Sequence, residues 1–126
     1  MTEPEKQALL GLLDTPDHWC KDLEARKADG TGTSFDAEDA VAWDLTGALC
    51  RLFGWNRARV LFGQFDRHIR GRRVAVLFSR DDGIRAMVAL QSFNDHPDRT
   101  FSQIHGAIVS MPIWSSGVRT NSAPRE

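Results

Sequence analysis

The chain has 126 residues, of which 41% are hydrophobic and 26% are charged, a composition typical of a globular protein with one core. No apolar run approaches the roughly 18 residues that span a bilayer, and the acidic start, MTEPEKQALL, does not resemble a signal peptide. The two cysteines, Cys20 and Cys50, lack a CxxC spacing, which favours reduced thiols over a disulfide framework. We therefore expect a cytoplasmic protein without a membrane segment or an intrinsic cofactor.

The net charge of −1 conceals an asymmetry along the chain. Residues 1–50 hold eleven acidic and four basic residues, a balance of −7, whereas residues 51–85 hold nine arginines and three aspartates, a balance of +6. Arginine presents a planar fork that suits carboxylates and phosphates. This layout indicates either an ion-pair network, within or between chains, or a polyanionic partner.

The N-terminal segment carries the signals of a helix followed by a break. Thr2 and Glu5 have the spacing of a capping box, and apolar residues then recur at helical spacing, which predicts a helix over residues 4–13. A proline soon afterwards ends this helix. Asp17 could cap a short second helix, and the composition of residues 27–34 (KADGTGTS) predicts a loop.

The central segment predicts two helices in succession. Asp36 is the candidate N-cap of the first, because acidic residues fill the turn that follows it, and Gly54 is placed to end it. The second begins at Asn56 and continues to Gly71. The apolar stripe of the first helix consists of Val41, Leu45, Ala48, Leu49 and Leu52.

The remaining segments predict two further helices. Residues 74–78 (VAVLF) could form a strand or a helix, and we prefer a helix or connector because a single strand would have no partner. Residues 84–93 have helical periodicity. Thr100 and Gln103 form a second capping box, which opens a final helix that Pro112 ends.

Together these elements predict a mainly α fold. We expect a single compact domain of about five helices in residues 1–114, with a short extended segment as the alternative near residues 74–78, followed by a flexible tail at residues 115–126. The predicted core is Leu9, Leu12, Trp19, Val41, Leu45, Ala48, Leu49, Leu52, Phe65, Phe93, Ile104 and Ile108.

Several short motifs occur in an order that resembles a family of small bacterial and phage proteins known only as a domain of unknown function. The matching residues are Trp19-Cys20, Ala25-Arg26, Asp29-Gly30, Asp39, Ala40-Val41, Gly47-Ala48-Leu49, Phe93-Asn94-Asp95 and Thr100. Phe93 stands where the pattern has Trp, and Asp44 stands where a small or apolar residue is usual. The resemblance implies an all-helical fold and no particular activity.

The densest polar cluster runs from Asn94 to Asp98. Asp95, His96 and Asp98 could supply metal ligands or an acid and a base, although their spacing matches no zinc motif. Asn and Asp side chains in loops also bond their own backbone, so an ordered turn before Thr100 is the favoured interpretation. A small enzyme or metal-binding protein built on this cluster is therefore our third hypothesis.

The densest basic patch consists of Arg67, Arg70, Arg72 and Arg73. Such arginines could contact the phosphates of DNA or RNA, which makes a nucleic-acid-associated protein our second hypothesis. The pI of about 6.4 is well below that of a dedicated nucleic-acid binder. A face directed towards solvent or a protein partner is the favoured interpretation of this patch.

Three positions carry structural rather than chemical signals: Trp19, Thr100 and Gly47. A glycine inside a good helix costs about 1 kcal/mol relative to alanine, so we expect Gly47 to permit close approach of another helix. Because no catalytic or metal motif emerges, the leading hypothesis is a non-catalytic interaction or regulatory module. Its acidic and arginine-rich parts would recognise a protein partner or a second copy of the chain.

Overall fold

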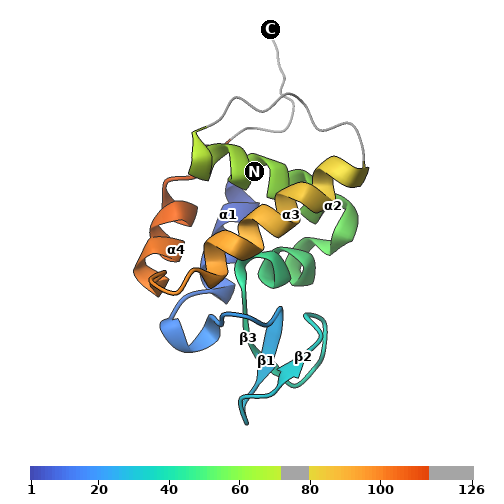
Figure 1. Ribbon diagram of the computed structural model, residues 1–126, viewed down its shortest axis with the longest axis vertical. Coiled ribbons are helices and arrows are strands. Elements are labelled where there is room, and N and C mark those ends of the chain that lie inside the picture. Colours follow the sequence, from blue (N-terminus) through green and yellow to red (C-terminus); the bar gives the residue numbers. More distant parts are fainter. Residues whose placement is uncertain (72–79, 114–126) are drawn as a thin grey trace, which may run out of the picture.

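The computed structural model describes residues 1–71 and 80–113. Within these ranges, four α-helices pack together and a three-stranded antiparallel sheet lies at one end of the molecule (Figure 1). The helices are α1 (Glu3–Leu12), α2 (Leu45–Arg70), α3 (Arg80–Asp95) and α4 (Phe101–Val109); the strands are β1 (Ala25–Lys27), β2 (Gly32–Thr33) and β3 (Ala40–Trp43); and a 3₁₀ turn, η1, spans Pro16–His18. The fold is one compact mixed α/β domain, so the prediction of a mainly α fold with about five helices was only partly right.

The two predicted capping boxes are confirmed. At the start of α1, the Thr2 hydroxyl accepts a hydrogen bond from the amide of Glu5, whose carboxylate accepts one from the amide of Thr2. Thr100 and Gln103 repeat this exchange at the start of α4. Both helices therefore begin where local hydrogen bonding satisfies N–H groups that the first helical turn leaves unpaired.

The helix predicted to start at Asp36 is wrong at its N-terminal end. Residues 40–43 form β3, which pairs antiparallel with β1, and β1 also pairs with β2, so the strand order is β2-β1-β3. The helix begins instead at Leu45, because Asp44 is the N-cap and its Oδ1 accepts a 2.6 Å hydrogen bond from the amide of Gly47. Val41 consequently lies on a strand and is exposed, which removes it from the predicted core.

Two other local predictions need correction. The short helix expected after Asp17 is only the 3₁₀ turn η1, and the loop expected at residues 27–34 contains β2 and the turn that joins it to β1. The interruption expected at Gly54 is present, since its φ of 77° and ψ of 165° are not helical, but α2 continues beyond it as a kinked helix. The predicted segments at 74–78 and 115–126 lie outside the described residues.

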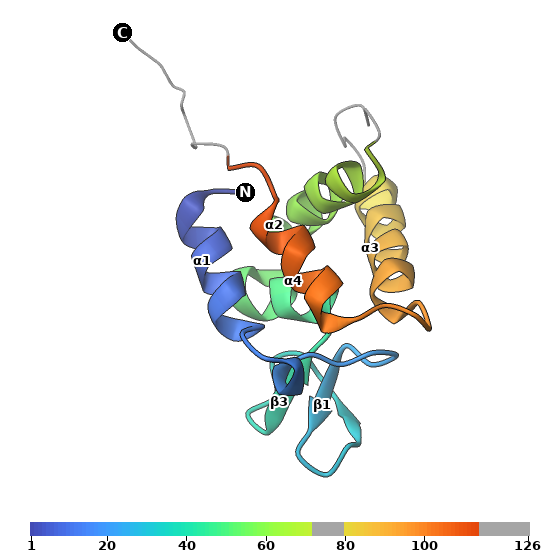
Figure 2. The ribbon, with the colours of Figure 1, turned by 90° about the vertical axis from the view of Figure 1, so that its left-hand side faces the viewer.

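Helix α2 forms the centre of the fold, with α1, α4 and α3 arranged around it (Figure 2). The fully buried predicted core residues are Leu9, Leu45, Ala48, Leu49, Phe65, Ile104 and Ile108. Those partly buried against the core are Leu12, Trp19, Leu52 and Phe93. Phe62 of α2 and Leu90 of α3 are also fully buried in this core. No helix within residues 1–71 and 80–113 is long and apolar enough to cross a membrane.

Candidate functional site

Asn94, at the end of α3, is completely buried and makes four hydrogen bonds. Its Oδ1 accepts from the indole N–H of Trp19 at 2.7 Å and from the amide of Leu45 at 3.1 Å. Its Nδ2 donates to the carbonyl oxygen of Cys20 at 3.0 Å and to the carboxylate of Asp95 at 2.9 Å. These contacts use both donors and both lone pairs of the amide, so Asn94 has no capacity left for a ligand.

Asp95 extends the same connection to the segment that precedes the sheet. Its Oδ1 accepts a 2.9 Å hydrogen bond from the amide of Asp22, which has a left-handed φ of 66°. The sequence favoured a local ordered turn before Thr100 as the role of Asn94 and Asp95. Their partners are instead distant in sequence, and they join α3 to the chain before β1 and to the start of α2.

His96 and Asp98 form a turn of their own. The amide of Asp98 donates to His96 Nδ1 at 3.1 Å, and the ammonium of Lys21 donates to the carbonyl oxygens of His96 and Pro97. In the described part of the chain, no group of three or more His, Cys, Asp or Glu side chains could hold a metal ion. The geometry of Asn94 to Asp98 therefore gives the metal or enzyme hypothesis no support.

Asp44, which lies near this cluster, has a strongly raised pKa. Its carboxylate is buried and accepts hydrogen bonds from the amide of Gly47 and the hydroxyl of Thr46. Burial raises the pKa of Asp44 to about 7, and the nearby carboxylates of Asp95 and Glu24 add to the increase. From the sequence, Asp44 appeared only as a departure from the family pattern.

The two cysteines are buried near Asp44, and neither is poised for chemistry. Burial, followed by the negative charge of Asp44, raises the pKa of Cys20 to about 12. Burial likewise raises the pKa of Cys50 to about 11. Since the thiolate is the reactive form of cysteine, both side chains are unreactive thiols at neutral pH.

Gly47 permits a close approach, as expected, but the approaching group is not a helix. A Cβ atom at this position would overlap the carbonyl oxygen of Glu24, immediately before β1. The same oxygen accepts a 3.2 Å hydrogen bond from the amide of Asp44. The prediction of a neighbouring helix was wrong, and the glycine instead lets the first turn of α2 contact the backbone that leads into the sheet.

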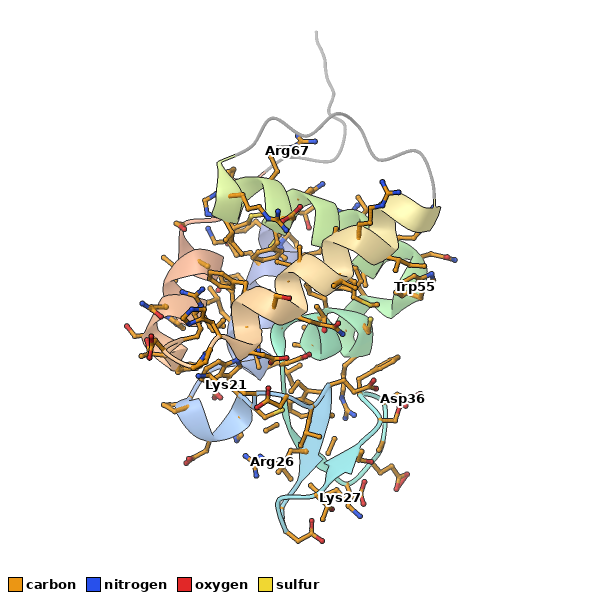
Figure 3. All side chains as sticks on the ribbon, in the orientation of Figure 1. Lys21, Arg26, Lys27, Asp36, Trp55 and Arg67 are labelled. Atoms are coloured by element: carbon orange, nitrogen blue, oxygen red, sulfur yellow. The ribbon has the colours of Figure 1, made fainter. Side chains whose placement is uncertain are left out.

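The predicted arginine patch is not a uniform exposed surface. Arg70 forms a 2.6 Å ion pair with Asp66 one turn earlier in α2. Arg67 lies at the end of the molecule opposite the sheet (Figure 3), and its Nε is buried without a hydrogen-bond partner in the part of the chain that the structure describes. Arg72 and Arg73 lie outside the described residues.

Another arginine, Arg57, makes a bidentate contact with Glu5 that joins α2 to α1, with N–O distances of 2.7 and 2.8 Å. The hydrogen bond from Arg57 lowers the pKa of Glu5 to about 2. With the Arg70–Asp66 pair, this contact shows that part of the arginine excess is used in internal ion pairs, one of the two arrangements that the charge layout indicated.

Sequence reasoning missed four exposed apolar side chains, two on α2 and two on α3, which we refer to together as the α2–α3 surface. Its members are Trp55 (39% exposed), Val60 (40%), Ile84 (39%) and Val88 (51%). The two helices lie side by side and share the most extensive helix–helix contact, and Trp55 lies just after the kink in α2 (Figure 3). Helical periodicity placed Ile84 and Val88 on a helix, but periodicity cannot show where an apolar stripe extends beyond its neighbour.

The fold and these contacts define a small mixed α/β domain. The side chain of Asn94 is buried in it, and internal hydrogen bonds satisfy all of that side chain's donors and acceptors. The chain belongs to the family of unknown function DUF6197, whose model matches residues 7–110. The resemblance noted in the sequence is thereby confirmed at the level of the family. No curated protein and no solved structure matches the chain.

Proposed function

We propose that the protein is a non-catalytic interaction module and that its partner is a second copy of the chain, bound across the α2–α3 surface. The observation that carries this proposal is the exposure of Trp55, Val60, Ile84 and Val88 on two adjoining helices. Large apolar side chains that gather on one surface mark sites of association, whereas scattered ones need no explanation. Tryptophan is also among the residues enriched at the centres of interfaces.

The charge distribution favours a second copy over an unrelated partner. Asp36, Glu38 and Asp39 are exposed near the sheet, and the arginine-rich part of α2 lies at the opposite end of the long axis (Figures 1 and 3). In a two-fold dimer with its axis perpendicular to that direction, the acidic end of each copy faces the basic end of the other. Such complementarity orients the two copies and excludes the parallel arrangement.

The nucleic-acid hypothesis receives less support from the same residues. Arg70 is already paired with Asp66, and the Nε atom of Arg67 is buried, so neither presents to a phosphate the complete fork of a bidentate contact; orientation of a second copy relies only on the overall charge of this end. Exposed valine and isoleucine side chains are also poor partners for a phosphate backbone. An arginine-dependent, steeply salt-sensitive affinity for DNA would reverse this ranking.

Sedimentation equilibrium of the full chain tests the proposal. We expect the wild-type protein to form a dimer with a dissociation constant of about 100 μM or tighter. Val88→Glu should raise this constant at least about tenfold, because it buries an unpaired charge in the interface. Val109→Glu is the matched control, since Val109 is 50% exposed but lies on α4.

Two results would overturn the proposal. One is a wild-type chain that remains monomeric up to about 0.5 mM, well above the expected constant. The other is a dimer that Val109→Glu weakens as much as Val88→Glu, which would place the interface elsewhere. Circular dichroism of each variant establishes that a loss of association is not a loss of folding.

A further inference from the structure

Residues 20–24, the segment that leads into the sheet, lie against the start of α2 beside a buried carboxyl group. Asp44 is only 2% exposed, and its amide donates a 3.2 Å hydrogen bond to the carbonyl oxygen of Glu24. The carbonyl oxygen of Trp43 accepts a 3.1 Å bond from the amide of Cys20. The two ends of the segment are therefore bonded to the backbone at Asp44 and at the residue before it.

The acidic groups around Asp44 oppose its ionisation. Burial is the main reason that the pKa of Asp44 is raised, and the carboxylates of Asp95, at the end of α3, and Glu24, in the segment, raise it further. A Cβ atom at Gly47 would contact both the Glu24 carbonyl oxygen and Asp44 Oδ1, so these two oxygen atoms also lie close together. A negative charge on Asp44 would thus face acceptors and carboxylates.

The cationic and thiol groups nearby do not offset this charge. Three cations on the elements that meet here donate to backbone carbonyl oxygens instead: Lys21, Arg26 and Arg51. Within residues 1–71 and 80–113, no ion pair includes Asp44, Asp95 or Glu24. The thiols of Cys20 and Cys50 have raised pKa values and stay neutral near pH 7.

The same segment is held in an unfavourable backbone conformation. Asp22 has a φ of 66°, and in the part of the chain that the structure describes it is the one residue other than glycine with a positive φ. Such residues keep this conformation only where the surrounding contacts impose it. The contact here is the 2.9 Å hydrogen bond from the Asp22 amide to the carboxylate of Asp95, so breaking it lets the backbone relax.

We propose that residues 20–24 form a latch that opens when the carboxyl group of Asp44 loses its proton. Ionisation adds a negative charge beside the carboxylates of Asp95 and Glu24, and movement of the segment away from α2 and α3 lets water solvate all three. The latch includes no residue of the α2–α3 surface, so it stands or falls independently of the proposed dimer.

The two pKa values of Asp44 set the size of the response. The pKa is about 7 with the latch closed, and it returns towards its ordinary value of 3.8 when water reaches the carboxyl group. Closure is therefore most favourable below pH 3.8 and weakens as the pH rises through about 7. From about pH 6 to about pH 8, the equilibrium constant for opening should increase roughly tenfold.

Amide hydrogen exchange of the full chain, measured by NMR, tests the latch. The amides of Cys20 and Asp22 are hydrogen-bonded only while it is closed. Their protection factors, which already correct for the pH dependence of intrinsic exchange, should fall about tenfold from about pH 6 to about pH 8. The amide of Leu45 donates to Asn94, which stays on α3, and should remain at least about tenfold more protected.

Variants show whether Asp44 controls the opening. Asp44→Asn retains an oxygen that can cap α2 but cannot ionise, so the protection factors of Cys20 and Asp22 should change by less than about twofold over the same pH range. Asp98→Asn is the matched control, because Asp98 is an exposed acid on the turn after α3, and it should keep the tenfold fall of about the wild-type size.

Should Asp44→Asn fail to fold, the NMR signal of the Asp44 carboxyl carbon in the wild-type chain decides the question. Its titration midpoint should coincide with the midpoint of the change in protection. The proposal is overturned if that midpoint lies below about pH 5 or if the protection of Asp22 is independent of pH. It is also overturned if Asp44→Asn shows the wild-type fall, or if Leu45 exchanges as fast as Asp22, since the whole domain would then be opening.

Discussion

The hydrogen bonds of Asn94 allow its contribution to stability to be worked out from its partners. In Asn94→Ala, the buried amide of Leu45 and the buried carbonyl of Cys20 lose their contacts with this side chain, and the indole N–H of Trp19 loses its acceptor. Each buried group left unsatisfied costs about 1–3 kcal/mol. Trp19 is only partly buried, so the two buried groups dominate, and we expect a loss of about 2–6 kcal/mol.

Urea denaturation measures this loss, followed both by far-ultraviolet circular dichroism and by tryptophan fluorescence. Ser92→Ala is the control, because Ser92 is exposed on the same helix two residues earlier and should change the free energy of unfolding by less than about 0.5 kcal/mol. A domain of this size is stable by about 5–15 kcal/mol, so the predicted loss is a large fraction of the total. An Asn94→Ala variant within about 1 kcal/mol of the wild type would refute the reasoning.

Three further predictions concern stability. The pKa of Asp44 is raised to about 7 in the folded state from its ordinary value of 3.8, so its protonation stabilises the fold below pH 3.8, and this stability is lost as the pH rises through about 7. Asp44→Asn should flatten that part of a pH series of urea melts. Gly47→Ala should lower the melting temperature, because its Cβ meets the carbonyl of Glu24, whereas Gly106→Ala, which meets nothing within 4 Å, should raise it slightly; equal effects would contradict the packing argument. Thr100→Ala should cost about 1 kcal/mol by removing the cap of α4, measured by urea denaturation, and no loss would mean that the cap is dispensable.

The features that sequence predicted correctly depend on short-range interactions. A capping box joins residues three positions apart, so Thr2 and Thr100 identified their helices without knowledge of the fold. The break at Gly54 was visible because glycine adopts positive φ without steric cost. Burial of Leu45 and Leu49 followed from helical periodicity, which holds wherever the helix itself is real.

The features that sequence missed depend on distant partners. Residues 36–44 contain three aspartates with N-cap chemistry, Asp36, Asp39 and Asp44, and local pattern does not decide among them. The pairing of β3 with β1 decides it, since residues held in a strand cannot also form a helical turn. Similarly, the sequence places Asn94 in a loop because three of its four hydrogen-bond partners, Trp19, Leu45 and Cys20, lie 49–75 residues away.

The bond between Asn94 and Leu45 has a consequence for the dynamics of α2. The first amides of a helix ordinarily have no intrahelical partner and exchange with solvent rapidly as the end frays. The amide of Leu45 is at this position, yet it is buried and donates to a side chain fixed in α3. Its hydrogen can therefore exchange only when α3 and the segment around Cys20 also separate, so the slowest exchange in α2 should include its first residue.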